Sequence, residues 1–301
     1  MKALIFGANG QDGFYLSHLC NQQEIECIAI SRSSSFYKGD VSNYREVEQF
    51  IHRYNPTYIF HLAANSTTLH SAVFENHQTI TTGTLNILEA VYKHSPTTKV
   101  FITGSGLQFK NEGLPIDEES IFEAKSPYSI ARIQSVYAAR YYRSLGLKVF
   151  VGYLFHHESP LRKPNHISQM IIQAVKNIDL GKQTNLELGD ISVEKEWTFA
   201  GDVAKAIFTL VQQDNMHEAV IGSGIASSIQ DWLEECFKLI GKDWQNYVTL
   251  KEGFQSEYKR LVSNPQKIKS LNWEPEISLT ELAQIMFISK NIPDRFFNDN
   301  N

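Results

Sequence analysis

Cysteine is scarce in this chain of 301 residues: only Cys20, Cys27 and Cys236 are present, and they lie far apart. Their number and spacing exclude a disulfide framework and a zinc site, and we expect no bound metal. Long apolar runs are missing as well, since no stretch approaches the roughly 18 residues of a membrane span. The four apolar residues before the first glycine are too few for the core of a secretion signal. We therefore expect a cytoplasmic protein in a reducing compartment.

Charge of one sign is not concentrated anywhere in the chain. The formal net charge is -5, and no block of like charges occurs. A nucleic-acid surface needs a basic face, so this class of partner is disfavoured. The composition, with 42% hydrophobic and 20% charged residues, is typical of a globular protein.

The first half of the chain alternates short apolar runs with helical patterns. Buried strands are expected at residues 3–6, 27–30, 58–62, 100–102 and 149–155. Helices are expected around residues 47–54, at 81–92 and from Pro127 to about residue 145, with Asn43 and Glu46 as a capping box for the first of them. This cadence indicates parallel βαβ units with right-handed crossovers. It predicts an α/β fold with a Rossmann-type, doubly wound parallel sheet.

The alternation weakens after about residue 155. Helical patterns occupy residues 169–178, 203–211, 231–240 and 279–288, and a glycine-rich break falls at 222–224. No low-complexity linker or internal repeat divides the chain. We therefore expect a dinucleotide-binding domain at 1–155 and a smaller substrate lobe at 156–301, from which the chain can cross back to the core. The tail at 294–301 is polar and expected to fray.

A glycine-rich loop joins the first expected strand to a helix. Its three glycines recur every three residues, and they suit a tight turn, close approach of a pyrophosphate and close helix packing. The N-terminus of the following helix would offer free N–H groups to the phosphates. Three glycines alone are weak evidence for a dinucleotide site, but their position between a strand and a helix supports the prediction. The loop residues predicted to bind a dinucleotide are Gly7, Asn9, Gly10, Gln11, Asp12 and Gly13.

The end of the second expected strand bears on the choice of cofactor. An NAD enzyme usually carries an acid there, whereas this chain has Arg32 and Ser33 within a serine-rich run, 31–35. A guanidinium and hydroxyls suit a 2′-phosphate through charge-assisted hydrogen bonds, which favours NADP. The alternative is a solvated polar loop. Asp40 and Val41 are expected near the adenine.

Several segments, in one order, resemble the extended short-chain dehydrogenase/reductases, and most of all the GDP-mannose 4,6-dehydratases. They include GANGQDGFYLSHL, SRSSSF, HLAANST, GTLNILEAV, SPYSIAR, LFHHESP, LGDISVEKEW and LNWEPEISLTEL. The resemblance spans about residues 3–286. It implies a bilobal fold, a nucleotide-sugar substrate and hydride transfer at the sugar C4, with Leu62, Ala63 and Ala64 beside the cofactor. It also implies a homodimer or homotetramer in which Arg162 and the loop 33–35 lie near a neighbouring subunit.

The resemblance assigns the catalytic acid/base to Tyr128. In the family a lysine follows one helical turn later and lowers the pKa of the tyrosine, because a phenol otherwise titrates near 10. Here that position holds Arg132, which keeps the charge but differs in shape. The alternative is a packed helical tyrosine with a solvated arginine.

The preceding strand departs from the family further. The family's Thr-Ser-Glu run aligns with Gly104, Ser105 and Gly106, so that the threonine that binds the sugar O4 and the glutamate that deprotonates C5 are both glycine. Thr103 or Ser105 could hold the sugar oxygen instead. Neither can replace a carboxylate, and no pattern indicates that Glu158 or Asp117 does so.

The residues expected at the substrate match those of the family only in part. His156 stands where the family has an asparagine, and Lys195 stands where it has an arginine. Phe254 occupies the position of a second family arginine, whose role Lys259 or Arg260 would have to take over. The predicted substrate contacts are His156, Glu158, Arg162, Asn165, Lys195 and Arg260. For His156, Glu158 and Arg260 a structural or solvated role is the alternative.

Three functions remain open from the sequence. The first is a GDP-hexose 4,6-dehydratase. The second is an NADPH-dependent 4-keto-6-deoxy-sugar reductase or an epimerase, which needs Tyr128 but not the missing glutamate. The third is a degenerate paralogue that binds the nucleotides without turnover. A partner other than a nucleotide sugar, NADP or a second copy is not expected.

Overall fold

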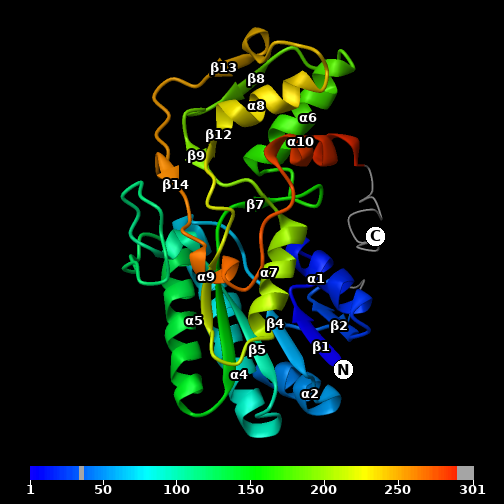
Figure 1. The fold of residues 1–301 in the computed structure, drawn as a ribbon, viewed down its shortest axis with the longest axis vertical. Helices are drawn as coiled ribbons and strands as arrows, with labels where there is room; N and C mark the ends of the chain where they lie inside the picture. Colours follow the sequence, from blue (N-terminus) through cyan, green and yellow to red (C-terminus); the bar gives the residue numbers. More distant parts are fainter. Residues whose placement is uncertain (34–36, 290–301) are drawn as a thin grey trace.

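The computed structural model describes residues 1–33 and 37–289 (Figure 1). Ser34 and Ser35 of the serine-rich run, and the tail expected to fray, lie outside the described residues. A seven-stranded parallel sheet forms the centre of the molecule, in the order β11-β6-β5-β4-β1-β2-β3. Its strands are β1 (Lys2–Phe6), β2 (Glu26–Ser31), β3 (Tyr37–Lys38), β4 (Tyr58–His61), β5 (Lys99–Ser105), β6 (Lys148–Leu154) and β11 (Glu218–Ile221).

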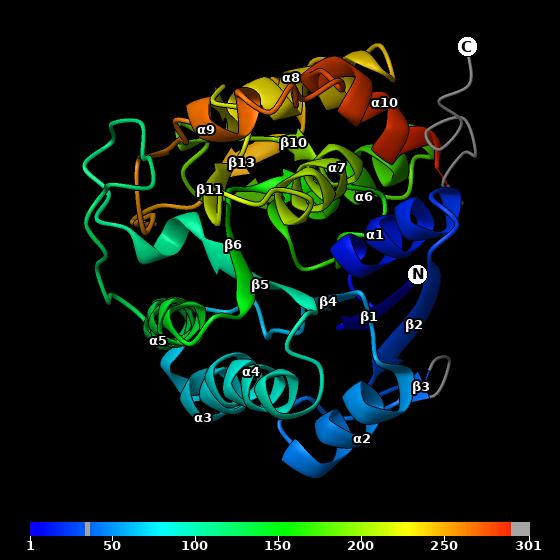
Figure 2. The same cartoon turned by 60° about the horizontal axis from the view of Figure 1, so that its bottom comes forward.

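Successive side chains of each strand point to opposite faces of the sheet, and apolar side chains are buried on both faces. In β1, Ala3 and Ile5 join one apolar core, while Leu4 and Phe6 join the other. Helices cover both faces (Figure 2). One face carries α2 (Tyr44–Tyr54), α3 (Val73–Asn76), α4 (Gly83–His94) and α5 (Pro127–Ser144), and the other α1 (Gln11–Gln22) and α7 (Ala200–Val211). The predicted doubly wound Rossmann-type fold is confirmed.

Two local predictions need correction. Asn43 does cap α2 by accepting from the Arg45 N–H, but Glu46 accepts from the Asn43 side chain and the Asp40 N–H, so the reciprocal bond of a capping box is missing. The helix expected from residue 81 is preceded by η1 (His70–Ala72), α3 and a π-helical turn, η2 (His77–Thr82), and α4 begins only at Gly83.

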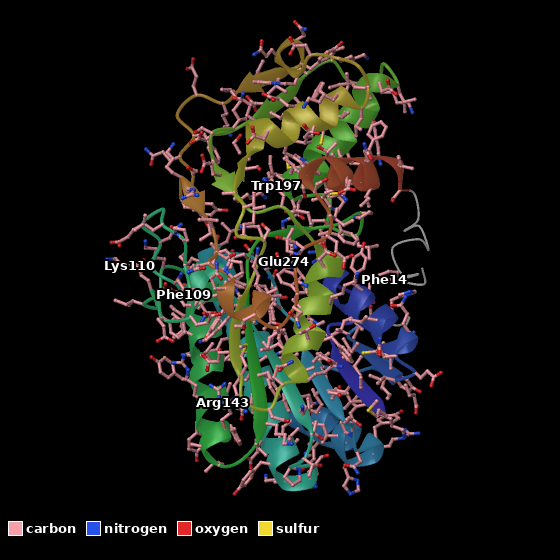
Figure 3. All side chains as sticks on the ribbon, viewed as in Figure 1. Phe14, Phe109, Lys110, Arg143, Trp197 and Glu274 are labelled. Atoms are coloured by element: carbon pink, nitrogen blue, oxygen red, sulfur yellow. The ribbon has the colours of Figure 1, made fainter. Side chains whose placement is uncertain are left out.

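The second lobe lies above the carboxyl ends of the strands (Figure 1). Trp232, which is fully buried, stacks on Trp197 at a centroid distance of 4.8 Å in this lobe's core; Figure 3 labels Trp197. Its elements are α6 (Ile167–Asp179), α8 (Ile229–Lys238), η4 (Trp244–Asn246) and α10 (Leu279–Ile288), with the short strands β8 (Leu186–Leu188), β9 (Glu194–Lys195), β12 (Ser227–Ser228), β13 (Val248–Leu250) and β14 (Arg260–Leu261).

The chain passes between the lobes more than once. β7 (His157–Glu158) leaves the sheet and pairs with β10 (Thr198–Phe199), after which α7 packs on the sheet. β11 then pairs with β6 at the sheet edge, and α9 (Gln266–Lys269) follows from the second lobe. No helix in the described ranges is long and apolar enough to cross a membrane.

Candidate active site

A cleft of about 700 Å³ lies between the sheet and the second lobe. It opens at the carboxyl ends of the parallel strands, where ligands of such sheets bind. Most of the residues singled out from the sequence line it: Gly7, Asn9, Gly10, Gln11, Asp12, Arg32, Ser33, Asp40, Val41, Leu62, Ala63, Ala64, Thr103, Ser105, Tyr128, Arg132, His156, Glu158, Arg162 and Lys195.

The glycine loop has the geometry of a phosphate cradle. Gly7 has a φ of +94°, and a Cβ there would lie 2.5 Å from the Ala63 nitrogen. Gly13 does not line the cleft, and instead lets α1 approach the loop, since its Cβ would lie 2.6 Å from the Ala8 Cα. Gly10 is the extended N-cap of α1 and provides no side-chain cap, so the first N–H groups of the helix stay available to an anion.

The loop after β2 brings a cation to the same cleft. Arg32 is well exposed, and its Nη2 lies 3.5 Å from Glu75 Oε1. Such a pair contributes about 0–1 kcal/mol, so an incoming phosphate can compete with the carboxylate. Ser33 hydrogen-bonds Ser31 at 2.9 Å and accepts from the Asn9 side chain. β2 ends in Ser31 and carries no acid there.

Tyr128 and Arg132 share one face of α5 at the edge of the cleft. The helix start is held by Ser126, whose hydroxyl accepts from the Ser129 N–H, and by Pro127 in the first turn. The Arg132 guanidinium carbon lies 5.0 Å from the centroid of the Tyr128 ring. The side chain is buried, and one Nη donates to the Thr103 carbonyl at 2.5 Å. The cation is therefore held against the phenol rather than solvated.

The two hydroxyls near Tyr128 are not equivalent. Thr103 donates its hydroxyl to the His61 carbonyl at 2.7 Å, so its proton is engaged. Ser105 accepts from the Leu107 N–H at 3.2 Å, which leaves its own proton available for a ligand oxygen. Ser105 is the better donor to a sugar oxygen.

Aromatic rings occupy the space beside Gly104 and Gly106, the two positions where the resemblance predicts a departure from the family. A Cβ on Gly104 would lie 2.6 Å from Cδ1 of Tyr153, and a Cβ on Gly106 would lie 2.9 Å from the Phe155 ring. Tyr153 is held in place by its hydroxyl, which donates to Glu218 at 2.6 Å. Gly104, Gly106 and the rings of Tyr153 and Phe155 thus pack together as one wall, which we call the wall beside Tyr128.

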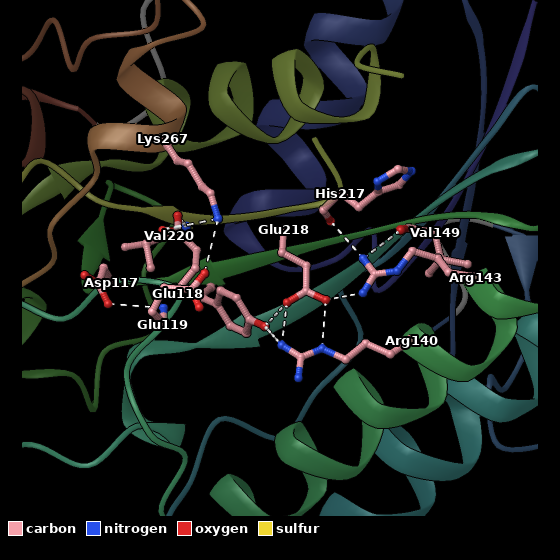
Figure 4. Close-up of polar contacts among 11 residues, drawn as sticks. Asp117, Glu118, Glu119, Arg140, Arg143, Val149, His217, Glu218, Val220 and Lys267 are labelled. Carbon is pink, nitrogen blue, oxygen red and sulfur yellow. Dashed lines mark hydrogen bonds and ion pairs between the residues drawn. The ribbon is translucent and has the colours of Figure 1, made fainter. Parts of the chain in front are cut away.

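Glu218 belongs to a network that joins α5 to β6 and β11 (Figure 4). Arg140 donates to it from Nε at 3.0 Å and from Nη2 at 2.7 Å, and Arg143 donates as well. Burial opposes ionisation of Glu218, but the hydrogen bonds from Arg140, Tyr153 and Arg143 outweigh it and lower its pKa to about 2. The ring of Tyr153 is therefore fixed by ionic partners.

Glu158 does not have the properties of a substitute acid/base. It is buried, accepts from Ser168 at 2.6 Å and lies 3.4 Å from both Lys195 Nζ and Arg162 Nε. Burial would raise its pKa, but the charges of Lys195 and Arg162 hold it at about 2. Asp117 is not among the residues described as lining the cleft and bonds Ser120 at 2.9 Å. With so low a pKa, Glu158 takes up no proton near neutral pH, and Asp117 lies outside the described lining of the cleft.

Two histidines of the LFHHESP segment face different partners. Nε2 of His156 lies 3.1 Å from the Tyr258 hydroxyl, and burial together with Lys195 lowers the pKa of His156 far below its usual value. His157 was not predicted as a site residue, yet it lines the cleft and its Nε2 lies 2.9 Å from Asp12. These contacts join residues more than 100 positions apart, and no sequence spacing signals them.

Two predicted substrate residues lie elsewhere. Arg260 has its Nε 2.9 Å from Glu194 and donates to the Gly113 carbonyl at 3.0 Å, and neither Arg260 nor Asn165 is among the described residues that line the cleft. β14 runs beside β9, which turns Arg260 towards Glu194. In the described part of the chain, no cluster of three or more His, Cys, Asp or Glu residues could hold a metal.

Comparison with known sequences places these features in one family. The family model for GDP-mannose 4,6 dehydratase matches residues 4–286. GDP-mannose 4,6 dehydratase 1 of Arabidopsis thaliana is 28% identical, over 94% of this chain and 88% of its own length. GDP-mannose 4,6 dehydratase 2 of Caenorhabditis elegans is 29% identical, over 95% and 88%.

Solved structures share the fold at lower identity. The RMD protein of Pseudomonas aeruginosa, complexed with NADPH, has a TM-score of 0.85 at 19% identity and covers 95% of this chain and 97% of its own. The dTDP-glucose 4,6-dehydratase of Bacillus anthracis, in complex with NAD, has a TM-score of 0.82 at 21% identity, with coverages of 94% and 96%. From the match along nearly its whole length, the chain belongs to the GDP-mannose 4,6-dehydratase family, whose relatives act on nucleotide sugars.

Proposed function

We propose that this protein is an NADP-dependent oxidoreductase that works at C4 of a nucleotide sugar without eliminating water. The observation that carries the proposal is the wall beside Tyr128. There the resemblance aligns Gly104 and Gly106 with the two side chains that the dehydration needs, and the rings of Tyr153 and Phe155 occupy the adjoining space. Reduction of a 4-keto-6-deoxy sugar, or epimerisation, is the corresponding reaction.

The residues present fit a nicotinamide dinucleotide. The uncapped N-terminus of α1 and the glycine cradle at Gly7 suit the pyrophosphate, and Val41 and Ala63 line the path towards Tyr128. A nicotinamide bound there would supply the hydride donor or acceptor. Arg32 and Ser33 support NADP over NAD, because an exposed guanidinium and a hydroxyl can bind a 2′-phosphate.

The chain's own groups account for the proton transfer. In reduction, the Tyr128 phenol would give its proton to the oxygen at C4, and in oxidation the phenolate would take it back. The Ser105 hydroxyl would donate to the same oxygen. Arg132 would place a positive charge beside the reacting phenol, since its guanidinium lies against the ring.

Elimination needs a base beside Tyr128, and neither glycine of the wall can supply one. Loss of water across C5–C6 requires a base that removes the C5 proton, and Glu158 is held ionised and buried by two cations. A carboxylate with a pKa of about 2 is a weak base near neutral pH. Arg162 and Lys195 face this single carboxylate, and their excess positive charge suits the diphosphate of the sugar nucleotide.

We also propose a homo-oligomer, either a homodimer or a homotetramer. Exposed apolar side chains gather on the neighbouring helices α4 and α5, namely Leu85, Tyr92, Ile130, Tyr137 and Tyr141. Light scattering would test this, and a monomer at assay concentrations would contradict it. The expected approach of a neighbouring subunit to residues 33–35 falls largely outside the described residues.

One experiment separates the three functions. The purified protein is incubated with NADP and GDP-mannose, and the nucleotide sugar is weighed by mass spectrometry. We expect no loss of water. The 4-keto-6-deoxy derivative of GDP-mannose is then offered with NADPH, whose absorbance should fall. A product lighter by one water in the first arm would make the protein a dehydratase. A new chromatographic peak of unchanged mass would make it an epimerase, and NADPH binding with neither sugar converted would make it a binding paralogue.

A further inference from the structure

The cofactor loop and the second lobe meet at one buried pair of side chains. His157 Nε2 lies 2.9 Å from Asp12 Oδ1, and His157 Nδ1 lies 2.7 Å from the Phe155 carbonyl. Asp12 is the second residue of α1, directly behind the Gly10 cap, and His157 begins β7. The contact therefore spans 145 positions of sequence and fixes the glycine loop against the segment that carries the sugar-side residues.

The hydrogen-bond partners dictate the proton content of the pair. A backbone carbonyl can only accept, so Nδ1 of His157 carries a proton. An ionised Asp12 can also only accept, so Nε2 must carry one as well. The contact thus holds one proton more than a neutral imidazole beside a carboxylate would. We propose that His157, as the imidazolium partner of Asp12, is a positioning residue for the dinucleotide pyrophosphate, and that cofactor binding requires this extra proton.

The physical reason is charge compensation at the helix N-terminus. Without the proton, the Asp12 carboxylate would place an uncompensated negative charge in the first turn of α1, where it would repel an incoming pyrophosphate and compete for the same N–H groups. With it, the pair is neutral. The proposal rests on the proposed function only in taking the dinucleotide as ligand.

Other charged groups modulate the pair but do not replace it. Arg162 faces both Asp12 and His157, Arg132 acts on Asp12 from α5, and His156 is the neighbouring ring. Burial would lower the pKa of His157, but Asp12 outweighs it and raises it above its usual value. Burial likewise opposes the ionisation of Asp12, and His157 outweighs it, so its pKa is lowered.

The sign of the pH dependence follows. A histidine with a raised pKa keeps its proton below about 6.5 and loses it as the pH rises through the raised value. Cofactor affinity should therefore be full at mildly acidic pH and fall on the alkaline side. Independent bonds keep the loop folded, because Gln11 donates to the His157 carbonyl at 3.1 Å and accepts from the Ser159 hydroxyl at 2.9 Å.

The test measures NADPH binding by fluorescence or calorimetry over a range of pH, so that no turnover is needed. We expect the dissociation constant of His157→Gln to rise about tenfold or more. The double variant Asp12→Asn/His157→Gln carries no charge at either position, and should recover most of the affinity and lose the alkaline decline. His166→Gln is the matched control, because His166 also lines the cleft but does not contact Asp12; its pH profile should follow the wild type.

Thermal unfolding of each variant without ligand checks that it is folded. A His157→Gln variant that binds NADPH with the affinity and pH profile of the wild type would overturn the proposal. So would a double variant that is as weak as the single one, because the effect would then not be one of charge. Wild-type protein that binds neither NADPH nor NADH would overturn the proposed function and this inference together, whereas binding without turnover would overturn the proposed function alone.

Discussion

The wall beside Tyr128 can be tested through stability alone. A Cβ at position 104 would lie 2.6 Å from Tyr153 Cδ1, so Gly104→Ala forces the ring to move. The ring cannot move freely, because its hydroxyl donates to Glu218 at 2.6 Å. Overpacking of this kind lowers the free energy of unfolding by about 1–3 kcal/mol. We expect Gly104→Ala to fall in the upper half of that range.

The same substitution should reverse its sign when the ring is removed. In a Tyr153→Val background the clash with the ring is absent, and the remaining close neighbour is the Gln108 side chain, whose Oε1 would lie 3.2 Å from the new Cβ. Alanine in place of glycine restricts the unfolded chain, which raises the free energy of unfolding by about 0.4–1 kcal/mol. The double-mutant cycle should therefore yield a coupling of about 2 kcal/mol or more. Urea unfolding near neutral pH, followed by tryptophan fluorescence, measures each corner.

Gly39→Ala provides the control for the cycle. Its Cβ would meet the Phe50 ring at 2.7 Å and Ile30 at 2.9 Å, at the opposite edge of the sheet from Tyr153, so its cost should be the same in both backgrounds. If Gly104→Ala costs equally with and without Tyr153, the ring does not exclude a side chain there, and the account of the wall is wrong. If the predicted coupling is observed, threonine at position 104 should be accommodated, and able to act as it does in the family, only when Tyr153 is also replaced by a smaller residue.

Three further outcomes are expected. Tyr128→Phe should abolish turnover of any nucleotide sugar and leave NADPH affinity intact in a binding titration; full residual activity would remove Tyr128 from the mechanism. Arg32→Ala should weaken NADPH by about 1.5–3 kcal/mol while leaving NADH nearly unchanged, because only the 2′-phosphate contact is lost; an equal loss for both would refute the NADP assignment. Glu218→Gln should lower the free energy of unfolding by about 3 kcal/mol near neutral pH, since it leaves the charges of Arg140 and Arg143 without their carboxylate partner. Because the pKa of Glu218 is depressed to about 2, the difference from wild type should be complete above about pH 5 and shrink as the pH falls towards 2 in acid-unfolding curves; a constant difference would argue against the ionic network.

Local sequence determined much of this protein. Strands buried on both faces read as short apolar runs, as at Leu4 and Ile5, and the alternation with helices specifies a parallel sheet. The glycine loop is equally local, because only glycine adopts the φ of +94° at Gly7 without strain. Tyr128 and Arg132 meet because residues four apart share a face of a helix. Helix boundaries were predicted less well where α4 follows the π-helical turn.

Contacts across the chain were decided only by the tertiary structure. Asp12 and His157 lie 145 positions apart, and they meet because the fold brings the start of β7 against the first turn of α1. The resemblance predicts a departure at Gly104, but only the register of β5 with β6 places Tyr153 opposite it. Arg260 was expected at the substrate and is instead paired with Glu194 on the neighbouring strand. Periodicity and glycine position act over a few residues, whereas charge pairing and packing depend on which strands become neighbours, and that depends on the whole fold.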